Sequence, residues 1–277
     1  MIQSLRTAGL PSAHQQQFLL TFQSVSYRYQ QADQSVPAVE NLTLTIPIGS
    51  FVAVVGPSGC GKSTLLHMAS GIMPPSAGQV ILHGKPLQGL ASNVGYVLQQ
   101  DGLLPWKTVA QNVGLALTLK GLKPDQIQDE VADWLKRTDL SRFAQSYPSQ
   151  LSGGMRKRAA LAASLINHPE LLLMDEPLSA LDVQTRILIG NELLTLWQRD
   201  RNTVLLVTHD LEEAIGMADY VVVLTARPAR VRAVYPIDLP RPRDLSLIRL
   251  TPEFQDLYSA IWTDLREEVL RAHVHHP

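Results

Sequence analysis

The chain has 277 residues, enough for one large domain or for one core with a smaller subdomain. Hydrophobic residues make up 45% and charged residues 18%, which is ordinary for a soluble globular protein. The formal net charge is -1, from 24 Lys and Arg against 25 Asp and Glu, so the composition gives no sign of a nucleic-acid or acidic-lipid partner.

The single cysteine, Cys60, excludes a disulfide within the chain and is typical of a reducing compartment. No apolar run approaches the roughly 18 to 20 residues needed to cross a bilayer. Residues 1–17 hold one arginine and no continuous apolar stretch, so they predict a loose N-terminal tail and not a secretory signal. The sequence therefore predicts a soluble, cytoplasmic protein.

The first strand signal in the chain is an alternation. Leu42, Leu44 and Ile46 alternate with threonines, which is the period of a half-buried strand. Four later runs are continuous and apolar, as expected of strands that are buried on both faces. These runs cover residues 51–55, 171–174, 203–208 and 220–224.

Helical stretches, such as residues 183–199, separate these runs. The alternation predicts an α/β fold with a mostly parallel sheet and helices on both faces. Residues 108–166 contain no buried strand run and predict a helical subdomain inserted into this core. In the C-terminal extension, residues 226–277, prolines within 239–243 predict an extended linker. Thr251 and a following proline then predict an amphipathic helix that packs on the core.

A glycine-rich loop follows the run at 51–55 and precedes a helical stretch at 64–70. It fits the pattern G-x-x-x-x-G-K-[ST], in which glycines let backbone N–H groups turn toward phosphate oxygens. The next helix directs its positive end at the same phosphates, the lysine supplies a cation, and the hydroxyl is offered to Mg²⁺. The predicted ATP-Mg²⁺ site comprises Gly56, Pro57, Ser58, Gly59, Cys60, Gly61, Lys62, Ser63 and Thr64.

Two carboxylates end the apolar run at 171–174. Because adjacent residues at a strand end can point in different directions, Asp175 can reach the Mg²⁺ while Glu176 faces an attacking water. Phosphoryl transfer needs both a metal holder and a group that orients or deprotonates the nucleophile. The pair therefore predicts that the chain hydrolyses ATP as well as binding it.

A second glycine-rich segment, Leu151-Ser152-Gly153-Gly154, lies before another helical stretch. With this segment the chain resembles the ATP-binding cassette (ABC) family, whose signature is L-S-G-G, over about residues 18–225. The resemblance implies a P-loop NTPase (RecA-like) core with an N-terminal antiparallel β subdomain and the inserted helical subdomain. Further positions fall in the family's order: Tyr29 at the adenine-stacking aromatic, Gln99 at the Q-loop, Asp175 and Glu176 at Walker B, Asp182 at the D-loop, and His209 at the switch histidine.

The resemblance also implies a mechanism. Two copies pair head to tail, and the signature loop of one copy, Ser152, Gly153 and Gly154, closes over ATP held by the other copy's P-loop. The implied catalytic residues are Glu176, His209 and Gln99, and the implied Mg²⁺ ligands are Ser63, Gln99 and Asp175.

Two of these positions keep an alternative. Tyr27 is the alternative to Tyr29 as the adenine platform, and Gln100 is the alternative to Gln99. Next to the signature, residues 156–158 (Arg-Lys-Arg) are predicted to form a solvated helix face.

For the remaining candidate residues we favour a structural interpretation over a functional one. Cys60 lies near a helix N-terminus, which can lower a thiol pKa, but we predict no catalytic role for it. His273, His275 and His276 could bind metal, although a frayed tail is the favoured interpretation. Met155 and Ala163 depart from the Gln and Arg that many relatives carry at these positions.

The segment at residues 103–106 (Leu-Leu-Pro-Trp), Met155 and the stretch 226–244 resemble nitrate/sulfonate/taurine-type importers. The resemblance implies transmembrane permease subunits as partners, indirectly a periplasmic or lipid-anchored solute-binding protein, and a place at the cytoplasmic face of the membrane. The alternative function is a soluble, non-transport ABC ATPase acting on DNA or ribosomes, and a non-hydrolysing regulator is a third possibility.

Overall fold

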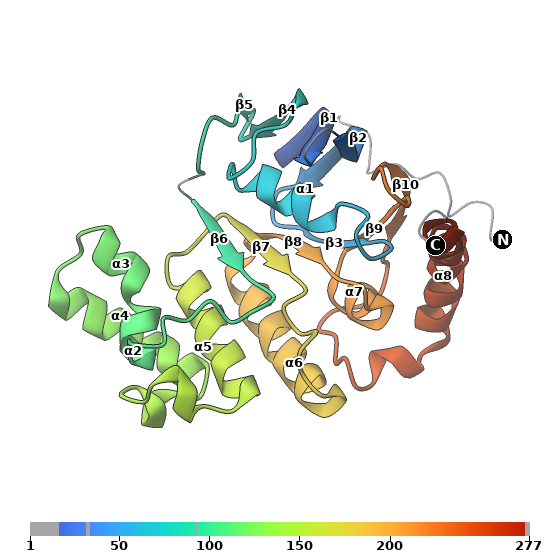
Figure 1. Cartoon of the computed structure of the whole chain (residues 1–277). Helices are drawn as coiled ribbons and strands as arrows, with labels where there is room; N and C mark the ends of the chain where they lie inside the picture. The colour runs from blue at the N-terminus through green and yellow to red at the C-terminus, as the bar shows by residue number, and fades with distance from the viewer. Residues whose placement is uncertain (1–16, 32–33, 92, 275–277) are drawn as a thin grey trace. The chain divides into compact units, whose positions relative to one another are not determined.

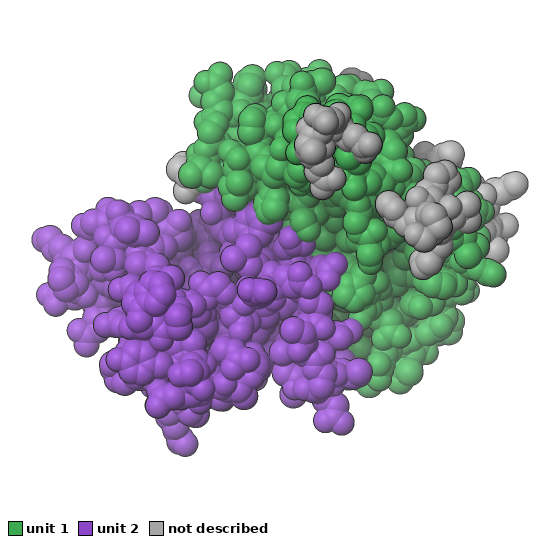
Figure 2. Space-filling model, viewed as in Figure 1, with its two compact units in different colours: residues 1–92, 200–277 green, residues 93–199 purple. Residues whose placement is uncertain are grey.

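The computed structural model describes residues 17–31, 34–91 and 93–274. The predicted N-terminal tail therefore lies outside the described residues except for its last position, as do His275 and His276 of the C-terminal histidine group. The chain divides into two compact units, residues 1–92 with 200–277 (unit 1) and residues 93–199 (unit 2), which Figure 2 colours separately. No helix among the described residues is long and apolar enough to span a membrane.

Unit 1 contains an antiparallel sheet in the order β2-β1-β4-β5. The predicted strand at residues 42–46 is confirmed as the second half of a longer strand, and its apolar side chains at 42, 44 and 46 are buried. The alternation of the sequence thus matches a sheet with one covered face. The strands are β1 (Phe18–Gln31), β2 (Gln34–Pro47), β4 (Ala77–Leu82) and β5 (Lys85–Pro86).

A second set of strands in unit 1 runs in the order β10-β9-β3-β8. The middle strand β3 pairs in parallel with both β8 and β9, while β10 pairs antiparallel with β9. Every residue of β3 and β8 is buried, as the continuous apolar runs predicted. These strands are β3 (Phe51–Val55), β8 (Thr203–Val207), β9 (Tyr220–Leu224) and β10 (Val231–Pro236).

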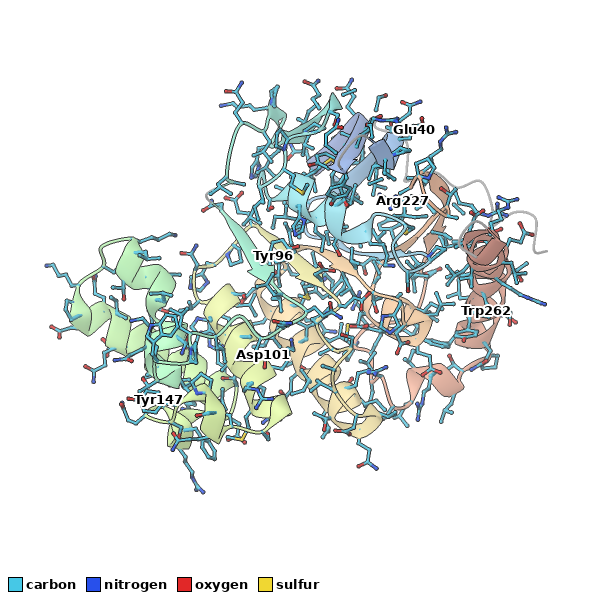
Figure 3. All side chains as sticks on the ribbon, in the orientation of Figure 1. Glu40, Tyr96, Asp101, Tyr147, Arg227 and Trp262 are labelled. Atoms are coloured by element: carbon cyan, nitrogen blue, oxygen red, sulfur yellow. The ribbon has the colours of Figure 1, made fainter. Side chains whose placement is uncertain are left out.

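Helices α1 (Lys62–Ala69), α7 (Leu211–Met217) and α8 (Pro252–Val274) accompany this sheet (Figure 1). The predicted amphipathic helix is confirmed as α8, with Thr251 Oγ1 accepting from the Phe254 amide at 3.4 Å at its start. Phe254, Ile261 and Leu265 are buried, and α8 contacts α7, β9 and β10. On the same helix Trp262 is 44% exposed (Figure 3). The extension therefore packs on the core, as its apolar stripe requires.

The segment at 239–243 forms no helix or strand, in agreement with the sequence. It nevertheless holds a buried cation, Arg243, whose guanidinium donates to several backbone carbonyls. Burial lowers the pKa of Arg243 to about 10, so the side chain is still charged at neutral pH. The acceptors are the carbonyls of Ile215, Gly216, Ala218, Ile237 and Leu239, at 2.6 to 3.4 Å.

Unit 2 pairs two parallel strands, β6 (Val94–Val97) and β7 (Leu171–Asp175). Within the predicted helical stretch 108–166 the structure has helices and 3₁₀ turns and no strand. That stretch forms only part of unit 2, which also contains β6, β7 and nearly all of α6 (Val183–Asp200). The predicted bounds of the helical subdomain, residues 108–166, therefore stay a prediction. The other helices are α2 (Val109–Val113), α3 (Leu115–Leu119), α4 (Pro124–Arg137) and α5 (Gly153–Leu165).

We expect Arg243→Met to lower the free energy of unfolding by about 3 kcal/mol, because several buried carbonyls lose a charged donor. The matched control is Arg249→Met, which removes an exposed pair with Glu212 at 3.7 Å and should cost under about 1 kcal/mol. Urea denaturation of both variants measures the difference. Equal costs would contradict the structural role given to Arg243.

Candidate functional site

The glycine-rich loop lies between the carboxyl end of β3 and the start of α1 in unit 1. Gly61 has φ +122°, and a Cβ there would lie 2.8 Å from the Ala38 carbonyl oxygen. Only glycine fits this conformation and this close approach. The turn lets the backbone curl immediately before the first residue of α1.

Lys62 is the first residue of α1 and its side chain folds back over the loop. Its Nζ donates to the carbonyl oxygens of Gly56 at 2.9 Å and Pro57 at 3.0 Å, and the residue is 7% exposed. Charge-assisted hydrogen bonds of this kind hold a cation in place. The ammonium is thereby fixed inside the curl of the loop.

The structure corrects the expectation that the nearby helix N-terminus lowers the pKa of the Cys60 thiol. The thiol is 1% exposed, and its burial raises the pKa, with the nearby Lys62 charge only partly opposing that effect. Desolvation of the thiolate outweighs the helix N-terminus that the sequence pointed to. At neutral pH the side chain is a small buried thiol.

Tyr29, on β1, shares a hydrogen bond of 3.0 Å between its hydroxyl and the Thr64 hydroxyl on α1. Tyr27 packs edge-on against the Tyr29 ring, with centroids 5.0 Å apart. The direct contact with the phosphate-loop helix is made by Tyr29, which favours it over Tyr27 as the aromatic of this site.

His209 follows the carboxyl end of β8 and is exposed. In the parallel register Val54 of β3 lies opposite Val207 of β8, so both strands end at the same edge of the sheet. Asp210 caps α7 by accepting from the Glu212 and Glu213 amides at 2.9 and 3.2 Å. The cap fixes the backbone that presents His209 at the edge where the phosphate loop begins.

Unit 2 brings together Gln99 and Glu176. The β6–β7 register sets Val97 opposite Met174. Gln99 lies two positions after Val97, and Glu176 lies two positions after Met174. The Gln99 Nε2 donates to a Glu176 carboxylate oxygen at 3.4 Å. Glu176 has φ +44°, a left-handed conformation that is uncommon outside glycine and is often found at functional sites.

Asp175, the last residue of β7, is half-buried beside Tyr96. Burial, and to a lesser extent the charge of Asp175, raises the pKa of Tyr96. This phenol therefore stays neutral next to the carboxylate. Asp175 therefore lies near Tyr96, whereas Glu176 contacts Gln99.

The signature segment opens α5. Ser152 is the N-cap, and its hydroxyl accepts from the Met155 amide at 3.3 Å. A Cβ at Gly154 would lie 3.0 Å from the Thr185 methyl group, so glycine permits the close approach of α5 and α6. Asp182 is exposed at the start of α6, where hydrogen bonds from Thr185 lower its pKa.

The solvated face predicted for residues 156–158 is wrong at Lys157. This lysine is 1% exposed, and its Nζ lies 3.2 Å from Asp101 Oδ1. Arg156 and Arg158 are partly exposed and form ion pairs with Asp101 and Glu192. Lys157 shares helical spacing with buried Ala160 and Leu161, which is the signal that could have predicted its burial. Sequence reasoning missed both Lys157 and Asp101.

The profile of the ABC transporter family matches residues 39–179, which include the phosphate loop, the signature and the paired acids. The chain belongs to the ABC transporter family. An uncharacterised ABC transporter ATP-binding protein of Methanocaldococcus jannaschii is 45% identical over 86% of this chain and 87% of that protein. The aliphatic sulfonates import ATP-binding protein SsuB of Bacillus licheniformis is 38% identical over 79% of this chain and 83% of its own length.

Solved structures agree with this assignment. An ATP-binding cassette solved as a dimer in a post-hydrolysis state with ADP and Pi is 30% identical, with a TM-score of 0.72 over 80% of this chain and 100% of that one. A Clostridium perfringens cassette described as part of an ABC transporter complex shares the fold, with a TM-score of 0.71 and 24% identity. The predicted P-loop NTPase fold is confirmed, and the chain is an ATP-binding ATPase of this family.

We expect the Cys60 thiol to react with iodoacetamide at pH 8 at least about tenfold more slowly than an exposed thiol, because its raised pKa leaves little thiolate. The comparison is Ser149→Cys, at an exposed position, in a Cys60→Ala background. The native rate should increase as the pH rises above 8. Equal rates for the two thiols would contradict the burial described here.

Proposed function

We propose that this ATPase energises an importer of a small solute by closing two copies of the chain around ATP-Mg²⁺. The observation that carries the proposal is that two glycine-rich helix N-termini, at α1 and α5, stand in two different units of one chain. The N-terminus of a helix binds phosphate through its backbone amides. A second N-terminus of this kind, on α5, could bind the phosphates of ATP held by another copy of the chain. The relative solved with ADP and Pi is itself a dimer.

In this proposal unit 1 binds the nucleotide. Tyr29 stacks on adenine. The backbone amides of residues 56–61, together with Thr64, surround the phosphates. Lys62 exchanges its hydrogen bonds to the loop carbonyls for contacts with the β- and γ-phosphates. His209, at the same sheet edge, contacts the γ-phosphate. The fixed position of Lys62 inside the loop supports its assignment.

The residues assigned to Mg²⁺ fit that ion. Ser63 is exposed on the first turn of α1, Asp175 ends β7, and Gln99 has an amide oxygen besides the nitrogen that contacts Glu176. All three supply hard oxygen ligands, which Mg²⁺ prefers alongside phosphate oxygens. When bound, the ion neutralises charge that develops on the phosphates.

Hydrolysis requires an oriented water. Glu176, held by its backbone conformation and by Gln99, accepts a hydrogen bond from the water that attacks the γ-phosphorus, and ADP departs as the leaving group. The signature residues Ser152, Gly153 and Gly154 of the second copy, with Asp182 nearby in unit 2, complete the closed state. Hydrolysis then reopens it.

The names of the relatives support the proposed transport role. SsuB proteins of Bacillus licheniformis and Bacillus cereus, 38% and 35% identical, are named import ATP-binding proteins for aliphatic sulfonates. We therefore assign a small oxyanion such as nitrate, sulfonate or taurine, or a related organic solute, supplied by a periplasmic or lipid-anchored binding protein. The chain would work at the cytoplasmic face of the membrane, attached to permease subunits.

Unit 2 carries a surface suited to the permease. A groove of about 630 Å³ is lined by apolar and polar side chains of α2, α3 and α4, including Leu115, Ile127 and Val131. Beside its lining residue Lys107, Trp106 is 70% exposed in the segment that follows Gln99. An exposed aromatic next to a groove is typical of a protein-binding surface.

We expect Glu176→Gln to bind ATP-Mg²⁺ but to hydrolyse it at least about 100-fold more slowly, because the water loses its base. Size-exclusion chromatography with light scattering should show a dimer only when ATP-Mg²⁺ is present. The matched control is Glu130→Gln, an exposed acid on α4, which should keep wild-type turnover. Retained turnover in Glu176→Gln would contradict the role given to Glu176.

We expect Trp106→Ala to lose co-purification with a co-expressed permease while keeping the ATPase rate of the isolated chain, because the side chain is exposed. Each integral membrane protein encoded beside the gene serves as the candidate. Leu90→Ala is the matched control, since Leu90 is 75% exposed in unit 1. If no candidate binds the wild-type chain, the non-transport alternative is favoured; equal binding by both variants would contradict the surface assigned here.

A further inference from the structure

A buried lysine on α5 is the strongest unassigned feature of unit 2. The Lys157 Nζ donates to the carbonyl oxygens of Leu98 at 3.3 Å and Gln99 at 3.1 Å, in addition to its ion pair with Asp101. A charge that is 1% exposed is costly unless it is paired and hydrogen-bonded. The contacts of Lys157 therefore fix the backbone on which Gln99 stands.

Asp101, which Figure 3 labels, connects this lysine to the signature loop through ion pairs with Lys157 and Arg156. Its second carboxylate oxygen accepts from Arg156 Nε at 3.0 Å, and Arg156 also donates to the Leu151 carbonyl oxygen at 2.8 Å. A continuous set of charge-assisted hydrogen bonds thus runs from the residue before Ser152 to the segment at 98–101. One anion shared by two cations from consecutive helix residues holds both segments at once.

The same segment delivers the Gln99 side chain to Glu176. Its amide nitrogen lies 3.4 Å from the carboxylate oxygen, at the long end of hydrogen-bond geometry, so a small shift of the backbone breaks the contact. Misplacing a group that orients a reactant by about 1 Å can lower a rate about 100-fold.

We propose that Lys157 is a positioning residue for hydrolysis: with Asp101 and Arg156 it ties the Gln99 backbone to the signature loop, so that Gln99 stays directed at Glu176. This proposal rests on the roles proposed above for Gln99 and Glu176. It predicts that Lys157 acts on the hydrolytic step through Gln99 and leaves nucleotide binding by unit 1 unchanged.

The first measurement separates turnover from binding. Lys157→Met should lower kcat by about 10- to 100-fold, with KM for ATP within about twofold of wild type, because the phosphate loop is untouched. The matched control is Arg158→Met, which removes a cation from the next position of α5 that pairs with Glu192 and not with residues 98–101. Its kcat should stay near wild type; an equal loss in both variants would overturn the proposal.

The second measurement is a double-mutant cycle with Gln99→Ala. If Lys157 acts through Gln99, the double variant has the kcat of Gln99→Ala alone. Losses that multiply would overturn the proposal, because they place the effect of Lys157 elsewhere. If Gln99→Ala alone keeps full kcat, the proposed function of Gln99 fails, and this single variant identifies that failure separately.

Asp101→Asn gives the same test and keeps an oxygen acceptor beside the buried Lys157 ammonium. Asp101 has a side chain that is 25% exposed, and the asparagine amide has nearly the same size, so this variant disturbs the packing less than Asp101→Ala would. Its kcat loss should be absent in a Gln99→Ala background and its KM unchanged. A loss of kcat that persists in that background would overturn the proposal.

Discussion

Parallel pairing of short, largely buried strands is the constraint on which the candidate site depends. In unit 1 the register of β3 with β8 brings the phosphate loop and His209 to one sheet edge. In unit 2 the register of β6 with β7 brings Gln99 opposite Glu176. Because the carboxyl ends of parallel strands lie at the same edge, residues far apart in the chain become neighbours there. A slip of one residue would turn every side chain to the other face.

Buried cations then hold the irregular segments that these strands leave behind. Lys62 donates to carbonyls of the phosphate loop, Lys157 to those of Leu98 and Gln99, and Arg243 to those around α7. Loops lack the regular pairing of helices and sheets, so their buried carbonyls need other donors. In this chain long basic side chains supply them; Lys62 is itself a candidate site residue, and Lys157 contacts the backbone of another, Gln99.

The sequence predicted what depends on local pattern. Continuous apolar runs located β3 and β9 at their observed bounds, and the glycine spacing located the loop before α1. The sequence did not predict the burial of Lys157 or Arg243. Most of the carbonyl oxygens that accept hydrogen bonds from these two side chains lie far away in the chain, so only the folded structure brings them together. For Cys60 the nearby helix N-terminus predicted a lowered thiol pKa, whereas burial of the side chain raises that pKa. Charge and periodicity disagreed at Lys157, and there periodicity was the better guide.

The division of unit 1 has a consequence for how the protein is made. The amide of Phe51 in β3 donates to a carboxylate oxygen of Asp219, 168 residues later in the chain. On the ribosome, β3 therefore emerges long before β8 and β9, while the continuous unit 2 is complete before either partner exists. Until then a wholly apolar strand has two unpaired edges, the condition in which nascent chains aggregate. The order of synthesis thus makes folding of unit 1 the late step, and it leaves β3 exposed until β8 and β9 have been made.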